Sequence, residues 1–122
     1  MQRLHFLKEN ISGSATVAMS LLPYVTTEYS IQKSGHVSRI TIMLTEARTG
    51  GTLTFKITKN GTAQAVLNAA IDATTTQYDE VFGDGDDLPF QAGDRIGLQI
   101  VSASFTLTTS DAVGIVELEE AL

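Results

Sequence analysis

The chain has 122 residues, 43% of them hydrophobic, and a formal net charge of −6 at pH 7. This length fits one domain with a single core, and the acidic balance argues against a nucleic-acid-binding protein, which needs a basic surface. The absence of cysteine excludes disulfides, thiolate nucleophiles and cysteine-ligated metals. We recognise no secretory signal and no apolar run of the ~20 residues that span a membrane, so we expect no membrane partner.

The charges are distributed unevenly along the chain. Residues 1–61 contain seven Lys or Arg against three acidic residues, whereas residues 62–122 contain one Arg against eleven acidic residues. The sequence allows two interpretations of this asymmetry. Either the two halves interleave in space and neutralise each other, or they form complementary faces that meet between subunits.

The N-terminal segment alternates loosely between apolar and polar residues. Residues 1–9, which include Leu4 and Phe6, suggest either a terminal strand or an extended arm. Residues 10–122 are then expected to form the main domain.

Short strands are predicted along the next part of the chain. Residues 15–22 and 24–32 are rich in apolar, β-branched and aromatic side chains. Residues 37–46 and 52–59 alternate more clearly, and the segment 47–51 between them ends in two glycines, which predicts a β-hairpin.

A second hairpin is predicted at Asn60-Gly61, because these residues tolerate the positive φ angles of a two-residue turn. The alanine-rich segment after it, residues 63–73, leaves two alternatives open. The flanking turn and threonines favour a strand, while the composition also suits a helix.

The C-terminal half contains the clearest strand. In residues 88–100 a Pro and a Gly-Asp turn precede Ile96, Leu98 and Ile100, which share one face at period two. A turn is expected at residues 102–104. With further strands at 76–82 and 113–119, the pattern predicts an all-β, single-domain jelly-roll β-sandwich of eight to ten antiparallel strands.

Catalytic motifs are not recognisable in this sequence. The two histidines, His5 and His36, lie in no nucleophile motif, so we expect no enzymatic activity and no cofactor. Asp84, Asp86 and Asp87 form an acidic loop whose oxygens suit Ca²⁺, although a solvated turn explains the same composition.

A sugar-binding platform would be built from exposed aromatic side chains. The chain has no Trp and three tyrosines, which suit the core or rim of a sandwich equally well.

Three stretches carry a resemblance to a known group of proteins. They are Gly-Gly-Thr-Leu-Thr-Phe-Lys-Ile-Thr-Lys-Asn-Gly at 50–61, Leu-Pro-Phe-Gln-Ala-Gly-Asp-Arg-Ile-Gly-Leu-Gln-Ile at 88–100, and Val-Gly-Ile-Val-Glu-Leu-Glu at 113–119. Together they resemble the small jelly rolls of bacteriophage capsid decoration (cement) and head-fibre proteins, and more distantly the C1q/TNF-type jelly roll.

The resemblance implies a non-enzymatic virion protein on the outer capsid surface. Such a protein decorates and stabilises the shell by binding the lattice of the major capsid protein as a symmetric oligomer, with a homotrimer favoured. The alternative that it implies is a host-receptor or glycan-binding domain of a head fibre or tail adhesin.

The N-terminal segment is the expected partner-binding site under this hypothesis, facing the capsid or the axis of the oligomer. Its residues are Arg3, Leu4, His5, Phe6, Leu7 and Lys8. If the segment is an arm, deletion of residues 2–8 should abolish binding and leave a folded domain.

Overall fold

The computed structural model describes residues 2–11, 13–22, 26–47, 49–71, 76–81, 88–106 and 110–120, with the backbone alone for residues 65–69. No helix in these ranges is long and apolar enough to cross a membrane. Their regular structure consists of eleven strands: β1 (Gln2–Lys8), β2 (Ala15–Ala18), β3 (Ser20–Leu22), β4 (Glu28–Ser30), β5 (Gly35–Leu44), β6 (Gly50–Lys59), β7 (Thr62–Ala70), β8 (Gln77–Val81), β9 (Leu88–Phe90), β10 (Arg95–Thr106) and β11 (Ala112–Glu120).

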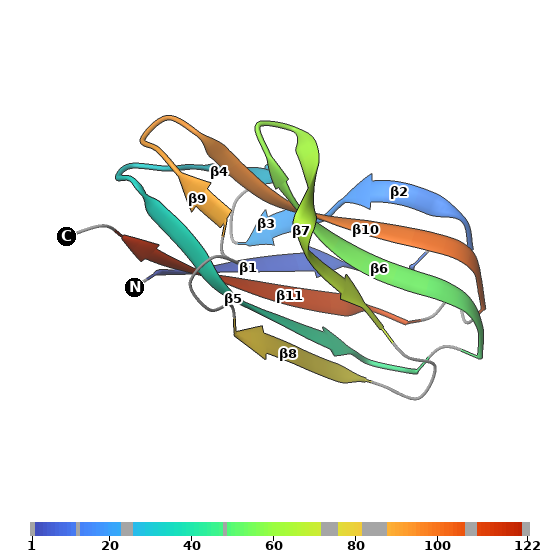
Figure 1. The fold of residues 1–122 in the computed structure, drawn as a ribbon. Coiled ribbons are helices and arrows are strands. Elements are labelled where there is room, and N and C mark those ends of the chain that lie inside the picture. Colours follow the sequence, from blue (N-terminus) through green and yellow to red (C-terminus); the bar gives the residue numbers. More distant parts are fainter. Residues whose placement is uncertain are drawn as a thin grey trace.

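The strands form two antiparallel sheets that pack against each other (Figure 1). The first, called the β1 sheet here, has the order β3-β1-β11-β5-β8, and β9 also pairs with β5. The second, called the β10 sheet, has the order β2-β10-β6-β7, and β4 also pairs with β10. Because the chain passes repeatedly from one sheet to the other, the predicted all-β jelly-roll sandwich is confirmed.

A hydrophobic core fills the space between the sheets, because alternate residues of each strand point inward. Ile96, Leu98 and Ile100 of β10 are buried, as their period-two spacing predicts. The same alternation buries three residues each of β5 and β6. These are Ile40, Ile42 and Leu44 in β5, and Leu53, Phe55 and Ile57 in β6.

The two sheets interlock where Leu98 of β10 packs against Gly114 of β11. An ideal Cβ atom placed on Gly114 would lie 2.2 Å from Leu98 Cδ2 and 3.4 Å from Ile42 Cδ1. Leu98 is 1% exposed, so other core residues surround its side chain. The glycine therefore fixes how closely the two central strands approach.

The predicted pairing of residues 37–46 with residues 52–59 is wrong. The strands exist, but β5 pairs with β11 and β8, whereas β6 pairs with β10 and β7. The intervening segment therefore crosses between sheets. Alternation predicts which side chains point inward, and it is the same for a hairpin and for a crossover.

Two other strand boundaries also differ from expectation. Residues 15–22 divide into β2, in the β10 sheet, and β3, in the β1 sheet. The turn expected at residues 102–104 is a bulge inside β10, where Ser104 has a φ of 49° and the register against β6 shifts. A residue with positive φ suits a turn and a bulge alike, so its local sequence does not distinguish them.

The second predicted hairpin is confirmed. Asn60 and Gly61 have φ angles of 53° and 84°, and they join β6 to β7. Residues 62–70 are a strand, which decides the strand-or-helix alternative for the described part of residues 63–73.

The N-terminal segment is a strand inside the β1 sheet and not an arm. β1 pairs along its whole length with β11 and on its other side with β3. Leu4 and Phe6 are 4% and 0% exposed and belong to the core. The expectation that residues 2–8 can be deleted from a folded domain is therefore wrong, because deletion would remove an interior strand.

Neighbouring substitutions in β1 test this placement. Phe6→Ala should lower the free energy of unfolding by about 3–5 kcal/mol, because it empties a fully buried site. Leu7→Ala, on the solvent side of the same strand, should lower it by less than about 1 kcal/mol. Urea denaturation measures both, and equal losses would contradict the burial of one face only.

Candidate binding face of the β1 sheet

The side of the β1 sheet that faces away from the core is called the outer face here. Its positions follow from the register of five strands, since directly opposed residues point to the same side. Three rows of opposed residues run across it: a charged row (Arg3, Glu117, Arg39, Val81), a central row (Leu22, His5, Ile115, Thr41, Asp79) and a mainly apolar row, called the apolar row here (Ser20, Leu7, Val113, Met43, Gln77).

Exposed apolar side chains gather on this face. In the described ranges the large hydrophobic residues that are exposed are Leu22, Met43 and Val81, and all three belong to the outer face. Half-buried Leu7, Val113 and Ile115 lie among them.

The opposite surface of the sandwich has a different composition. Outward positions of β6 and β10 hold mainly Thr, Lys and Gln, and the large apolar residue among them is half-buried Val101. Among the side chains that the structure describes, the exposed apolar surface is thus concentrated on the outer face, which is typical of a docking surface.

An ionic network crosses the outer face beside these apolar residues. The Glu117 carboxylate lies between two arginines, with Oε1 at 3.0 Å from Arg3 Nε and Oε2 at 3.6 Å from Arg39 Nε. Arg39 also binds both carboxylate oxygens of Asp79, with Nε donating to Oδ1 at 2.7 Å. Two positive and two negative groups therefore balance within the network.

One member of the network, Glu117, is buried beneath the others. The Glu117 side chain is 10% exposed although it lies on the outer face, because the arginines on either side cover it. Open depressions of about 320 Å³ and about 410 Å³ flank Thr41 on this surface. The relief is shallow, which suits contact with a broad surface better than enclosure of a small molecule.

Asp79 is held in its ionised form. Arg39 lowers the pKa of this carboxyl through a hydrogen bond, with a further contribution from Thr41 Oγ1, which donates to Oδ1 at 2.9 Å. The same contacts with Asp79 raise the pKa of Arg39.

The six partner-binding residues predicted from the sequence do not act as one group. Arg3, His5 and Leu7 lie on the outer face, whereas Leu4 and Phe6 point into the core. Lys8 folds back on its own turn, where Nζ donates to the Glu9 carbonyl oxygen at 2.7 Å.

Residues of β3, β5, β8 and β11 also contribute to the outer face, and their part in it was not predicted from the sequence. Arg39 and Met43 carried a usable signal, because alternation places them opposite the buried residues of β5. Nothing in the sequence places β11 between β1 and β5, so the grouping of Ile115 and Glu117 with them was not foreseeable.

The predicted calcium ligands Asp84, Asp86 and Asp87 lie outside the described residues. Among the residues that the structure describes, no group of three or more His, Asp or Glu side chains is arranged to hold a metal ion.

The tyrosines do not form an exposed aromatic platform where they are described. Tyr29 and Tyr78 pack against the core. Tyr29 accepts a hydrogen bond from Gln2 Nε2 at 2.9 Å, and the Tyr78 hydroxyl donates to Glu80 Oε2 at 2.5 Å. This hydrogen bond, aided by burial and by the negative charge of Glu80, raises the pKa of Tyr78 to about 12.

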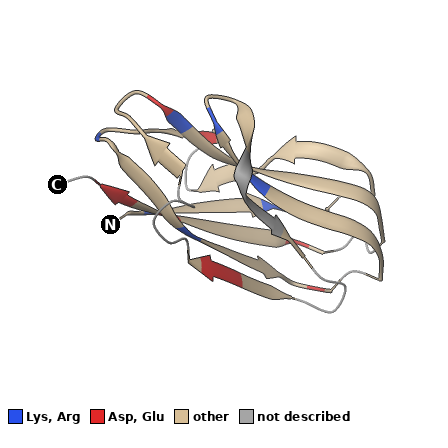
Figure 2. Ribbon diagram, in the orientation of Figure 1, with Lys and Arg blue, Asp and Glu red and all other residues tan. Residues whose placement is uncertain are grey.

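The uneven charge of the two sequence halves is explained by interleaving. Ion pairs join basic residues of the first half to acidic residues of the second, as in Arg3–Glu117, Arg39–Asp79 and Lys59–Asp94. Arg95 pairs in the reverse sense with Glu28. Figure 2 shows the resulting mixture of blue and red segments over both sheets.

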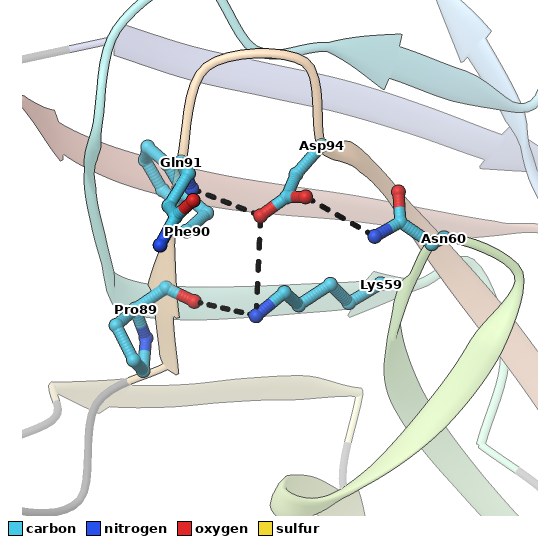
Figure 3. A pocket seen from close by; sticks show the side chains of 6 residues that line it. All are labelled: Lys59, Asn60, Pro89, Phe90, Gln91 and Asp94. Atoms are coloured by element: carbon cyan, nitrogen blue, oxygen red, sulfur yellow. Dashed lines mark hydrogen bonds and ion pairs between the residues drawn. The ribbon is translucent and has the colours of Figure 1, made fainter.

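Away from the outer face, another hollow, of about 400 Å³, lies where the turn after β6 meets the turn before β10 (Figure 3). Asp94 accepts hydrogen bonds from the Gln91 backbone N–H at 2.9 Å and from Asn60 Nδ2 at 3.2 Å. Lys59 Nζ donates to the Pro89 carbonyl oxygen at 3.2 Å and lies 3.9 Å from Asp94.

This cluster, called the Asp94 clamp here, ties the two turns together. Asn60 completes it by exchanging hydrogen bonds with the Arg95 backbone, in which its N–H donates to the carbonyl oxygen at 2.8 Å and its Oδ1 accepts from the N–H at 2.9 Å. The Gln91 N–H, followed by Asn60, lowers the pKa of Asp94. The clamp is therefore first of all a structural device.

Acid should destabilise the protein through Asp79 and Asp94. Both have pKa values below the ordinary 3.8, so their contribution is complete above that pH and is lost as the pH falls through the lower folded-state values. The double variant Asp79→Asn/Asp94→Asn should lose less thermal stability between pH 5 and pH 2 than the unmodified protein. Melting curves across this range measure the effect, and parallel losses would refute it.

The Tyr78–Glu80 hydrogen bond predicts a shifted phenol titration. Glu80→Gln should lower the pKa of Tyr78 from about 12, because the charged acceptor that holds the phenolic proton is removed. Absorbance at 295 nm follows the titration, and Tyr78→Phe identifies which transition belongs to this residue. An unchanged titration in Glu80→Gln would rule the interaction out.

Comparison with known proteins adds little beyond the strand arrangement itself. No family model and no curated protein matches the chain. Among solved structures, Eiger TNF from S. frugiperda matches with a TM-score of 0.46 and 15% identity, covering 98% of this chain and 94% of that chain. The carbohydrate-binding module CBM36, in complex with calcium and xylotriose, matches with a TM-score of 0.48 and 16% identity, covering 98% and 100%. At this level of similarity neither match assigns a function.

Proposed function

We propose that this chain is a non-enzymatic structural protein that works by protein–protein association through the outer face of the β1 sheet. Its proposed partner is the major capsid protein lattice of a bacteriophage head, where it sits on the outer surface as a symmetric oligomer and reinforces the shell. The capsid and the oligomer come from the sequence resemblance. The choice of surface comes from the fold.

The observation that carries this proposal is the concentration of exposed apolar side chains on one side of the sandwich. Leu22, Met43 and Val81 are 43%, 36% and 67% exposed, and all belong to the outer face. Aliphatic residues exposed on one sheet and mainly polar residues on the other favour burial of the apolar side against protein.

The balanced ionic network supports a protein partner of the same kind. Because Glu117 and Asp79 are already paired with arginines, a partner does not have to supply countercharges for them. Binding then removes water from charges that stay paired, and this costs less free energy than removing water from isolated charges.

The alternative function is that of a receptor- or glycan-binding adhesin domain. The observation that favours this alternative is the hollow at the Asp94 clamp. Lys59 and Asp94 supply a donor and an acceptor there, and Pro89 adds an apolar ring beside them (Figure 3). A sugar hydroxyl can use both kinds of group. The hollow is open, however, and its polar groups already bond to one another.

Co-sedimentation with undecorated phage capsids tests the proposal. The protein should pellet with capsids, and Ile115→Glu should reduce retention at least tenfold, because it places a charge at the centre of the outer face. Val101→Glu is the matched control, since it makes the same change on the other sheet, and it should retain binding.

Failure of the unmodified protein to pellet with any capsid would overturn the capsid proposal. Binding to cells or to a glycan panel that is lost in Lys59→Ala, and unaffected by Ile115→Glu, would establish the adhesin alternative instead.

A further inference from the structure

We propose that in the free protein the outer face is covered by a second copy of this chain, bound about a two-fold axis that runs parallel to the strands between β11 and β5. This inference rests on the proposed function only in taking the outer face as a protein-binding surface. It names what covers this face before the capsid binds, and the capsid lattice would have to displace the second copy.

The register of the β1 sheet makes the outer face self-complementary about this axis. A two-fold axis in the plane of contact and parallel to the strands exchanges β11 with β5 and β1 with β8. The axis leaves the position along the strands unchanged and reverses the order of the strands. Each row therefore meets the same row of the second copy, with its residues in reverse order. Such an isologous contact uses the same surface twice and closes at two copies.

In the charged row this arrangement brings opposite charges together. Glu117 and Arg39 are directly opposed neighbours on β11 and β5. Exchange of the two strands therefore sets each Glu117 against Arg39 of the second copy. In the central row His5 lies opposite Asp79 of the second copy. No like charges are opposed in either row, and Arg3 at the edge of the charged row meets Val81 of the second copy.

In the apolar row the same exchange buries hydrophobic surface. Val113 meets Met43 of the second copy, and Met43 meets its Val113. Ile115 of the central row meets Thr41, whose hydroxyl is already engaged with Asp79. The apolar contacts thus lie beside the axis, where the two faces approach most closely.

The other two-fold axis in the plane of contact fits poorly. An axis perpendicular to the strands would reverse the order of the rows and set the charged row against the apolar row. Arg39 would then face Met43 of the second copy, and Glu117 would face its Val113. Three charged groups, those of Arg3, Glu117 and Arg39, would lie against hydrocarbon, whereas the axis parallel to the strands places only Arg3 there. Charges covered by hydrocarbon lose hydration without compensation, so the perpendicular axis is disfavoured.

The size of the face predicts a weak dimer. Four strands spaced about 4.8 Å apart, with side chains covering about 20 Å along them, give a footprint of about 400 Å² per copy. Twisted sheets stacked face to face cross at about 30°, so contacts near the axis fit better than those at the edges. The capsid lattice and a second copy compete for the same face, and a weak self-contact is one that the capsid can displace.

Sedimentation equilibrium over a concentration series tests the dimer. The apparent mass should rise from that of the 13.1 kDa chain towards twice this value at the highest attainable concentration. Met43→Glu should abolish the rise, because it sets a carboxylate against Val113 of the second copy, while Val101→Glu should leave it unchanged. Circular dichroism confirms that both variants remain folded. A monomer at all concentrations, or a limiting mass of three chains, would overturn the inference.

Cross-linking tests the arrangement, and the chain has no cysteine of its own to interfere. A mixture of Leu7→Cys and Gln77→Cys chains, joined by a short bismaleimide, should give mixed dimers in several-fold excess over dimers of either variant alone, because the axis sets Leu7 of β1 against Gln77 of β8 while two copies of either position lie three strands apart. Replacing Gln77→Cys by Val101→Cys should remove this excess. Equal yields in the two mixtures would overturn the predicted axis.

The two proposals can fail separately. A dimer that does not sediment with capsids keeps this inference and removes the capsid partner. A monomer that does sediment with capsids keeps the capsid partner and removes this inference.

Discussion

The packing of β10 against β11 is the contact on which the rest of the sandwich depends. Each strand lies inside its own sheet, and Leu98 of one occupies the space left by Gly114 of the other. Close packing at this point allows the two sheets to share one core without a disulfide to hold them. With one side of each sheet committed to the core, the remaining sides are free to differ in chemistry.

The proposed function depends on this difference between the free sides of the two sheets. The free side of β6 and β10 is mainly polar, while that of the β1 sheet combines exposed aliphatic residues with an ionic network. Arg39 links the two parts, because it pairs with Glu117 and Asp79 and is opposed by Val81 on β8. A partner would therefore meet hydrocarbon and paired charges together, with the charges giving orientation and the hydrocarbon most of the affinity.

The sequence predicts the inward and outward sides of the strands well and their partners poorly. Ile96 and Leu98 were assigned correctly because period two follows from the geometry of a single strand. The Asn60-Gly61 turn was also correct, since its φ requirement is local. In contrast, β5 and β6 are neighbours in the chain that belong to different sheets, and local pattern carries no information on that. The candidate site shows the same limit, because its residues come from strands that only the topology brings together.

The position of β11 has a consequence for how the protein is made. This strand lies between β1 and β5, so that Arg3 and Glu117 pair across 114 positions of sequence. During synthesis β1 and β5 leave the ribosome long before β11, the strand that separates them. Until β11 follows, the inward-facing apolar side chains of β1 and β5 cannot pack as they do in the folded protein. Chain topology of this kind makes folding slow and late. Until β11 has been translated, the exposed aliphatic side chains of the nascent chain can make non-native contacts. The rate of translation elongation is therefore expected to affect the yield of folded protein.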